Sequence, residues 1–153
     1  MVSRYASNTQ VPQDRSEAEI KRLVLRYGAD EYIAGQAAGQ AIVVFHINNR
    51  RVRFELPFPK ADEAQRTPSG RMRRGDAAVM AYEQEIRRRW RSLALVIKAK
   101  LEAVATGVTT FEQEFLAHIV MPDGKTVGQH VAPSIEAAYA GGKVRALLPE
   151  FAS

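Results

Sequence analysis

The chain has 153 residues, a formal net charge of +5 and no cysteine. The length predicts one domain with its own core, and the lack of cysteine excludes disulfides, zinc–thiolate sites, iron–sulfur clusters and cysteine nucleophiles. No apolar run approaches the about 18 residues of a membrane span, and the polar N-terminus lacks the apolar stretch of a secretory signal. We therefore expect a cytoplasmic protein whose basic charge favours anionic partners.

Residues 1–13 are expected to form a flexible arm, and residues 14–153 a single domain. The first predicted helix begins at Ser16, because Ser16 and Glu19 have the spacing of a capping box. Gly28 is predicted to end it, since glycine readily adopts the left-handed conformation that commonly follows a helix. The apolar stripe between them has helical spacing: Ile20, Leu23, Val24 and Tyr27.

Three strands are predicted next, over residues 30–36, 41–47 and 50–56. Asn48 and Asn49 suit a two-residue type I′ turn, because asparagine tolerates the positive φ that both positions need. With this turn, strict alternation buries one face of the hairpin (Val43, Phe45, Val52 and Phe54) and exposes Arg51 and Arg53 on the other.

Residues 60–75 are predicted to be a flexible basic loop, because they combine proline and glycine with four arginines and show no apolar periodicity. The long helix expected from Asp76 to Ala105 carries an apolar band centred on Trp90, which we predict to be its anchor in the core. The band consists of Val79, Tyr82, Ile86, Trp90, Leu93, Ile97, Leu101 and Val104. A cationic group occupies the far side of the helix: Arg87, Arg88, Arg91 and Lys98.

A small helix–hairpin–helix annex is expected after Gly107. Thr110 and Gln113 have the spacing of another capping box and predict a short helix. A hairpin is predicted from strand 119–121 and return strand 126–128. Pro133 is predicted to start the last helix, because proline suits a first helical position. Its inward residues would be Ile135, Ala138 and Tyr139.

The predicted fold class is therefore α+β: a helix, a three-stranded antiparallel meander, a long amphipathic helix and the annex. The order helix–strand–strand–strand–helix resembles that of double-stranded-RNA-binding domains, which contact phosphates and 2′-hydroxyls rather than bases. This chain lacks a basic motif of the expected kind at the start of its second helix, which is also longer than in that family.

The stretches Gln10–Pro59 and Glu83–Pro149 carry three motifs: the helix that begins Ser-Glu-Ala-Glu-Ile at Ser16, the stretch Arg51–Pro59 and the stretch Thr110–Gly128. With these motifs, the two stretches resemble small uncharacterised proteins encoded by phages and prophages. The resemblance covers most of the chain and implies a phage-like origin, without implying an activity or any catalytic residue.

Catalytic patterns are scarce, so we expect no enzymatic activity, metal or other cofactor. Glu114 and His118 are one helical turn apart and His130 is a third potential ligand, but the HExxH pattern is absent. A helix-end salt bridge or a solvated surface is the alternative interpretation of these three residues. The chain also has no Gly-x-Ser-x-Gly sequence of the serine hydrolases.

The arginines carry the functional prediction, because the guanidinium group binds phosphate through two hydrogen bonds at once. We expect sequence-nonspecific binding to the phosphate backbone of DNA or RNA by one surface, provided that the long helix packs near the hairpin edge. Its residues would be Arg51, Arg53, Arg71, Arg73, Arg74, Arg87, Arg88, Arg91 and Lys98. Side chains available for stacking on bases are Tyr5, Tyr32, His46 and, if it is not in the core, Trp90.

Two alternatives remain open at the sequence level. The arginines could form a solvated helix face paired with nearby glutamates, or a basic surface that binds and modulates a host enzyme. The oligomeric state is also open, since the apolar band of the long helix would pair across a homodimer if the sheet did not cover it.

Overall fold

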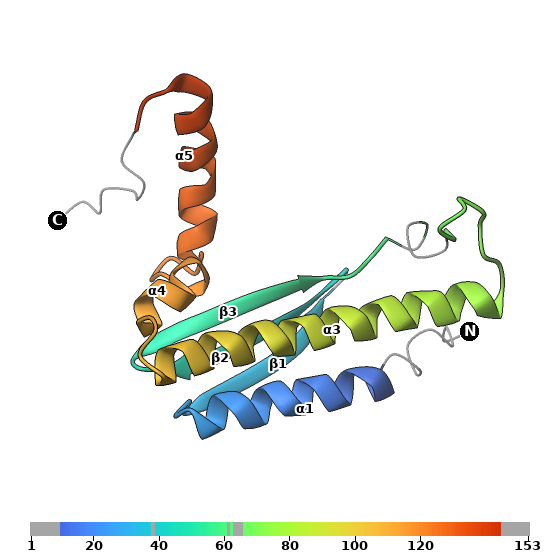
Figure 1. Ribbon diagram of the computed structural model, residues 1–153, viewed down its shortest axis with the longest axis horizontal. Helices are drawn as coiled ribbons and strands as arrows, with labels where there is room; N and C mark the ends of the chain where they lie inside the picture. Colours follow the sequence, from blue (N-terminus) through green and yellow to red (C-terminus); the bar gives the residue numbers. More distant parts are fainter. Residues whose placement is uncertain (1–9, 38, 61, 63–65, 145–153) are drawn as a thin grey trace.

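The computed structural model describes residues 10–37, 39–60, 62 and 66–144, and side chains from residue 15 onward (Figure 1). The chain has the predicted α+β fold, with a three-stranded sheet between two long helices in sequence and an annex after them. In chain order its elements are α1 (Gln10–Arg26), β1 (Glu31–Ala37), β2 (Gln40–Ile47), β3 (Arg50–Pro57), α3 (Asp76–Ala105), α4 (Phe111–Phe115), the 3₁₀ helix η1 (Leu116–His118) and α5 (Val127–Gly141).

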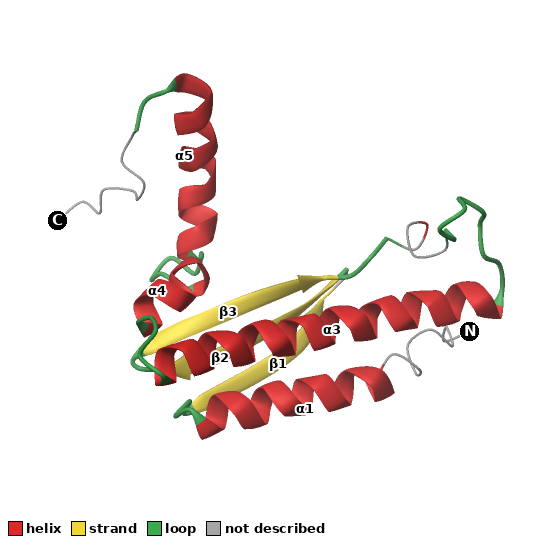
Figure 2. Ribbon diagram, in the orientation of Figure 1, coloured by secondary structure: helices red, strands yellow, loops and turns green. Residues whose placement is uncertain are grey.

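The sheet is antiparallel, with strand order β1-β2-β3, and α1 and α3 pack side by side along it (Figure 2). Alternate residues of β2 are buried, as expected for a sheet with one face in the core. The core joins this face to the apolar sides of α1, α3 and α4. Among the described residues, no helix is both long and apolar enough to cross a membrane.

The β2–β3 hairpin is confirmed in turn type and register. Asn48 and Asn49 have φ values of 50° and 59°, as a type I′ turn requires. Phe45 lies opposite Val52 and Val43 opposite Phe54, and these four side chains are buried. The apolar pattern therefore fixed the register, because a shift by one residue would have turned all four toward solvent.

Helix α1 ends as predicted but begins earlier. The N–H of Gly28, whose φ is 103°, donates to the carbonyl of Leu25, and the N–H of Ala29 donates to that of Val24, which is a Schellman ending. The predicted start at Ser16 is wrong, since the helix begins at Gln10 and Ser16 is buried inside it. Pro12 does not prevent this start, because backbone N–H groups in the first helical turn have no intrahelical partner. Residues 10–13 of the expected arm are thus helical, and residues 1–9 lie outside the described residues.

Helix α3 has the predicted bounds, and its apolar band faces the chain's own core. The side chain of Trp90 is 1% exposed, which confirms its assignment as the anchor. Because Ile86, Leu93, Ile97 and Leu101 are also buried, the band is not available for the helix-to-helix homodimer considered from the sequence.

The annex begins as predicted and then departs from the expected hairpin. Thr110 caps α4 through a capping box, but the expected return strand 126–128 reduces to one bridge between Val120 and Thr126. Thr126 instead caps α5: its hydroxyl accepts from the backbone of Gln129, whose side chain accepts from the backbone of Thr126. This second capping box starts the helix at Val127. Pro133 is therefore inside α5 rather than at its start.

Helix α5 projects away from the rest of the molecule (Figure 1). The expectation that Ile135 and Tyr139 point inward is wrong, because they are 45% and 90% exposed, and Ala138 is only partly buried. No residue of α5 is buried. Its apolar pattern alone did not show that the helix lies beyond the edge of the core.

The annex is attached to β3 by a backbone hydrogen bond and by contacts between aromatic rings. The N–H of Val120 donates to the carbonyl of Arg51 at 2.8 Å, and Phe115 packs edge-on against Phe45 and Phe54 in the core. The His118 ring stacks on Phe54, with 4.0 Å between ring centroids.

The stacking of His118 gives an expected pH dependence of stability. Burial lowers the pKa of His118 from its ordinary 6.5, and the nearby charge of Lys100 lowers it further. A hydrogen bond with the backbone of Arg53 raises the pKa by a smaller amount. Between the folded and unfolded pKa values the unfolded chain binds more protons, so the stabilisation is complete above pH 6.5 and is lost as the pH falls. We expect the free energy of unfolding, measured with urea, to fall less between about pH 7.5 and about pH 5.5 for His118→Phe than for the wild type. Equal losses would contradict the assignment.

Candidate nucleic-acid interface

A cleft of ≈ 600 Å³ lies between the loop before α3 and the N-terminal half of that helix. Helix α3 extends past the ends of the strands here, so this part of its surface is covered by the loop rather than the sheet (Figure 1). Among the described residues, the charged ones of the lining are five arginines and one carboxylate: Arg66, Arg73, Arg88, Arg89, Arg91 and Glu85. The cleft is therefore strongly cationic.

The loop is held in shape by its own backbone. Arg66 and Met72 form an isolated antiparallel bridge, and the N–H of Thr67 donates to the carbonyl of Arg71 at 2.8 Å. The Thr67 hydroxyl accepts from the backbone of Arg71, and Gly70 closes the turn with a φ of 84°. Residues 66–72 of the predicted flexible loop thus form a closed turn, and Arg66 and Arg73 at its ends line the cleft across from α3.

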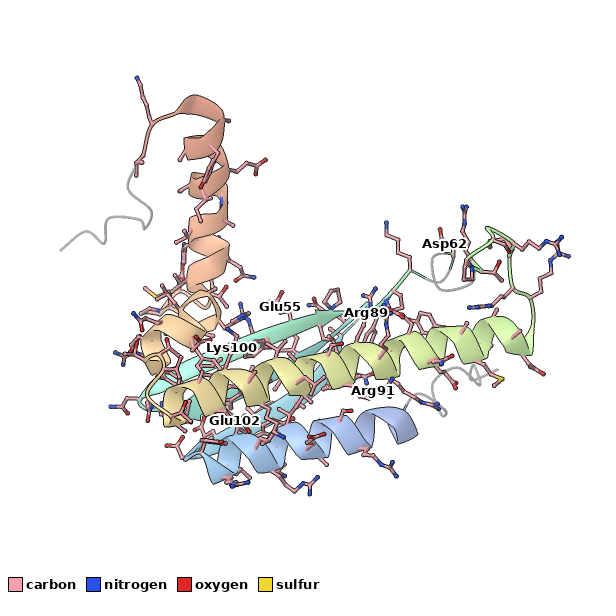
Figure 3. All side chains as sticks on the ribbon, viewed as in Figure 1. Glu55, Asp62, Arg89, Arg91, Lys100 and Glu102 are labelled. Carbon is pink, nitrogen blue, oxygen red and sulfur yellow. The ribbon has the colours of Figure 1, made fainter. Side chains whose placement is uncertain are left out.

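Glu85 organises the helix side of the cleft. Its carboxylate accepts hydrogen bonds from Arg88 and Arg89 at 3.2 Å. Arg89 also donates to the carbonyl of Pro57 at 2.6 Å, which fixes it to the end of β3. Figure 3 shows Arg89 on the side of α3 that faces β3, and Arg91 on the opposite flank. The cleft therefore has guanidinium groups on both flanks of the helix.

Arg88 is highly accessible, with 71% of its side chain exposed. Because the Arg88 guanidinium is exposed, its ion pair with the half-buried Glu85 leaves it accessible to an anion from solvent. Arg89 is more enclosed and held at two points. The arrangement gives one fixed guanidinium, that of Arg89, beside the more accessible guanidinium of Arg88.

Six of the nine arginines and lysines predicted from the sequence are on or beside this surface, and Lys98 lies farther along α3. Arg73, Arg88 and Arg91 line the cleft. Arg71 and Arg74 are exposed on the same loop, and Arg87 and Lys98 are exposed on α3. Lys98 is ten residues beyond Arg88, about 15 Å along the helix.

Arg51 and Arg53 lie elsewhere, so the prediction of one continuous patch is wrong. They are at the start of β3, beside the annex and the C-terminal half of α3, a helix about 45 Å long. Arg51 is 3.7 Å from Glu31. Arg53 is only 21% exposed, pairs with Glu55, and donates to the carbonyl of Gly124 and the side chain of Gln129. Arg53 therefore clamps the annex to the sheet.

Sequence reasoning missed two cleft residues, Arg66 and Arg89. Arg89 has a recognisable signal, because it follows Glu85 by four residues and pairs with it across one helical turn. Arg66 has no such signal, since only the turn that joins it to Met72 brings it back to α3.

Among the proposed stacking residues that the structure describes, none lines the cleft. Trp90 is buried, Tyr5 lies outside the described residues, and His46 pairs with Asp30 at 2.6 Å. The hydroxyl of half-buried Tyr32 lies 3.4 Å from the carbonyl of Glu17, and burial raises its pKa. A neighbouring pocket of ≈ 490 Å³, which shares Glu85, Arg88 and Arg89 with the cleft, is aliphatic: its apolar lining is Leu56, Pro57, Leu93 and Val96.

The three residues considered as metal ligands have other contacts. Glu114 pairs with Lys100 at 3.3 Å, His118 stacks on Phe54, and His130 is 2.7 Å from Asp123. Hydrogen bonds from the backbone of Lys125 and from His130 lower the pKa of Asp123. Within the described residues, no cluster of three or more such side chains could hold a metal ion.

Comparisons with family models, curated proteins and solved structures give no match to this chain.

Proposed function

We propose that the protein is a non-enzymatic accessory protein of phage-like origin that binds nucleic acid in the cytoplasm without sequence specificity. The observation that carries this proposal is the cleft whose described lining contains five arginines and one carboxylate. Its phage-like origin rests on the sequence resemblance alone.

The chemistry of the cleft favours the backbone over the bases. Arginine recognises phosphate oxygens through its planar fork of donors, and phosphate contacts position a protein without reading sequence. None of the described residues of the lining is aromatic, so the described lining offers contacts to phosphate rather than stacking on bases. Because Arg71, Arg74 and Arg87 flank the cleft and are exposed, a strand that enters it can also be contacted on either side.

The test is a fluorescence-anisotropy titration of labelled single- and double-stranded DNA and RNA. Each neutralised phosphate releases counterions, so about four contacts should lower the affinity for duplex DNA by roughly 100-fold between about 50 mM and about 200 mM salt. Unrelated sequences should bind alike. Absence of binding to every nucleic acid at low salt would overturn the proposal.

The second candidate is a small interaction protein that binds and modulates a host enzyme. The aliphatic pocket beside the cleft favours it, because Leu56, Leu93 and Val96 adjoin Arg88 and Arg89. A partner segment with acidic residues and an aliphatic side chain would occupy both the cationic cleft and the aliphatic pocket. This candidate predicts no affinity for generic nucleic acid, so the same titration separates the two.

A further inference from the structure

Strand β1 is at the edge of the sheet, and the backbone ladder shows which of its groups face outward. In the hairpin, Ile47 and Arg50 close the turn as a hydrogen-bonded pair. Along antiparallel strands, hydrogen-bonded pairs alternate with pairs that share no hydrogen bond. Odd-numbered residues of β2 therefore bond to β3, and even-numbered residues to β1. Through the β1–β2 register, Ile33 and Gly35 bond to β2, whereas the N–H and C=O of Tyr32 and Ala34 point away from the sheet.

From Tyr32 to Ala37 this edge lacks three features that protect many edge strands, although the charged Glu31 begins the strand and α1 packs beside it. Natural edge strands are protected by charged residues, proline or bulges. Residues 32–37 contain no charged residue and no proline, and their register with β2 is unbroken. On the outer face of this strand the side chain of Ile33 is 63% exposed.

We propose that two copies of this chain pair through β1, antiparallel, about a two-fold axis that passes through the Ala34 pair. The two sheets then join into one. Ala34 of each copy exchanges two hydrogen bonds with Ala34 of the other, because its outward N–H and C=O meet their counterparts. A two-fold contact of this kind uses the same surface on both subunits and is the commonest way in which proteins form dimers.

The side chains of β1 are self-complementary in this register. Ile33 faces Gly35 of the second copy as a non-hydrogen-bonded pair, in which the Cα atoms approach to about 4.5 Å. Gly35 has no side chain, and a Cβ added there would meet nothing within 4 Å, so the exposed Ile33 side chain can lie across it. Glu31 falls at the rim, opposite Ala37. This match between Ile33 and Gly35 selects a second copy over an unrelated strand.

The first test measures the mass of the protein in solution by sedimentation equilibrium. The wild type should be dimeric, and Ala34→Pro monomeric, because proline removes an N–H that points away from β2 and leaves the β1–β2 ladder intact. Ile33→Lys should also be monomeric, since it places a charge over Gly35 of the other copy. Circular dichroism and thermal melting identify variants that retain the fold. If Ala34→Pro does not fold, Ile33→Lys decides.

Tyr139→Ser is the matched control, because Tyr139 is the most exposed large apolar residue of α5 and lies far from β1 in sequence. This variant should remain dimeric. A monomeric wild type would overturn the proposal, as would a dimer that survives both β1 substitutions. A dimer lost only in Tyr139→Ser would show that α5 forms the interface instead.

A second test checks the register. The chain has no cysteine, so a single introduced thiol reports only on the dimer contact. Ala34→Cys should form an intermolecular disulfide under mild oxidation, since hydrogen-bonded pairs have Cα atoms about 5.5 Å apart. Ile33→Cys should cross-link more slowly, because position 33 of the second copy is its diagonal neighbour, with the Cα atoms roughly 7–8 Å apart. The reverse order would contradict the axis at Ala34.

Discussion

Replacing Trp90 with alanine is expected to lower the free energy of unfolding by about 3–5 kcal/mol, the usual cost of deleting a large buried aromatic side chain. Trp90 is 1% exposed and sits at the centre of the buried band of α3. Because small domains have a total stability of about 5–15 kcal/mol, the variant should unfold at much lower urea concentration. Equilibrium urea denaturation followed by circular dichroism measures the change.

Two further variants show whether the effect comes from packing. Trp90→Phe should cost much less, because it keeps most of the apolar volume and removes an indole N–H that is buried without a hydrogen-bond partner in the described structure. Leu95→Ala, at an exposed position of the same helix, should change stability by less than about 0.5 kcal/mol. If Trp90→Ala retained wild-type stability and lost only nucleic-acid binding, the core assignment would be wrong.

Replacing both Arg88 and Arg91 with glutamine is expected to weaken nucleic-acid binding by roughly 10- to 100-fold, since each charged hydrogen bond contributes on the order of 1 kcal/mol or more. The loss should be similar for all sequences, and the salt slope should flatten by about one for each lost phosphate contact. Stability should change little, because both side chains are exposed. The anisotropy titration at two salt concentrations measures the affinity and the slope.

The matched control is Arg50→Gln with Arg51→Gln, which removes the same charge at the other end of the molecule. These residues pair with Glu112 and Glu31 on the surface, so their loss should leave the affinity and the salt slope nearly unchanged. An equal loss in both double variants would mean that net charge, rather than the cleft, governs binding.

The two proposals are independent and can fail separately. The Ile33 and Ala34 substitutions act on β1, whereas the Arg88 and Arg91 substitutions act on the cleft, which β1 does not line. If both hold, each dimer presents two cationic clefts, and a nucleic acid that reaches both would bind more tightly through the raised effective concentration of the second cleft.

The sequence by itself determined the elements whose causes are local. The Asn48-Asn49 turn and strict alternation fixed the hairpin register, and Gly28 fixed the end of α1. The apolar band determined the bounds of α3 and the burial of Trp90. These results follow from backbone preferences and side-chain periodicity, which act over a few residues and need no knowledge of distant segments.

Competing local signals were harder to rank. Ser16 has a capping-box partner and Pro133 suits a first helical position, yet α1 begins before Ser16 and α5 before Pro133. In α5, the Thr126–Gln129 capping box decides the start. Both patterns occur at helix starts and inside helices, so the sequence could not choose between them.

Only the tertiary structure decided which charges lie together. The turn that returns Arg66 and Arg73 to α3 joins them to Arg88, Arg89 and Arg91, far along the chain. The same packing sends Arg51 and Arg53 to the opposite end, where Arg53 binds the annex. Charged side chains have no periodic burial requirement, so their pattern in the sequence does not specify their neighbours, whereas the packing of β3, the loop and α3 does.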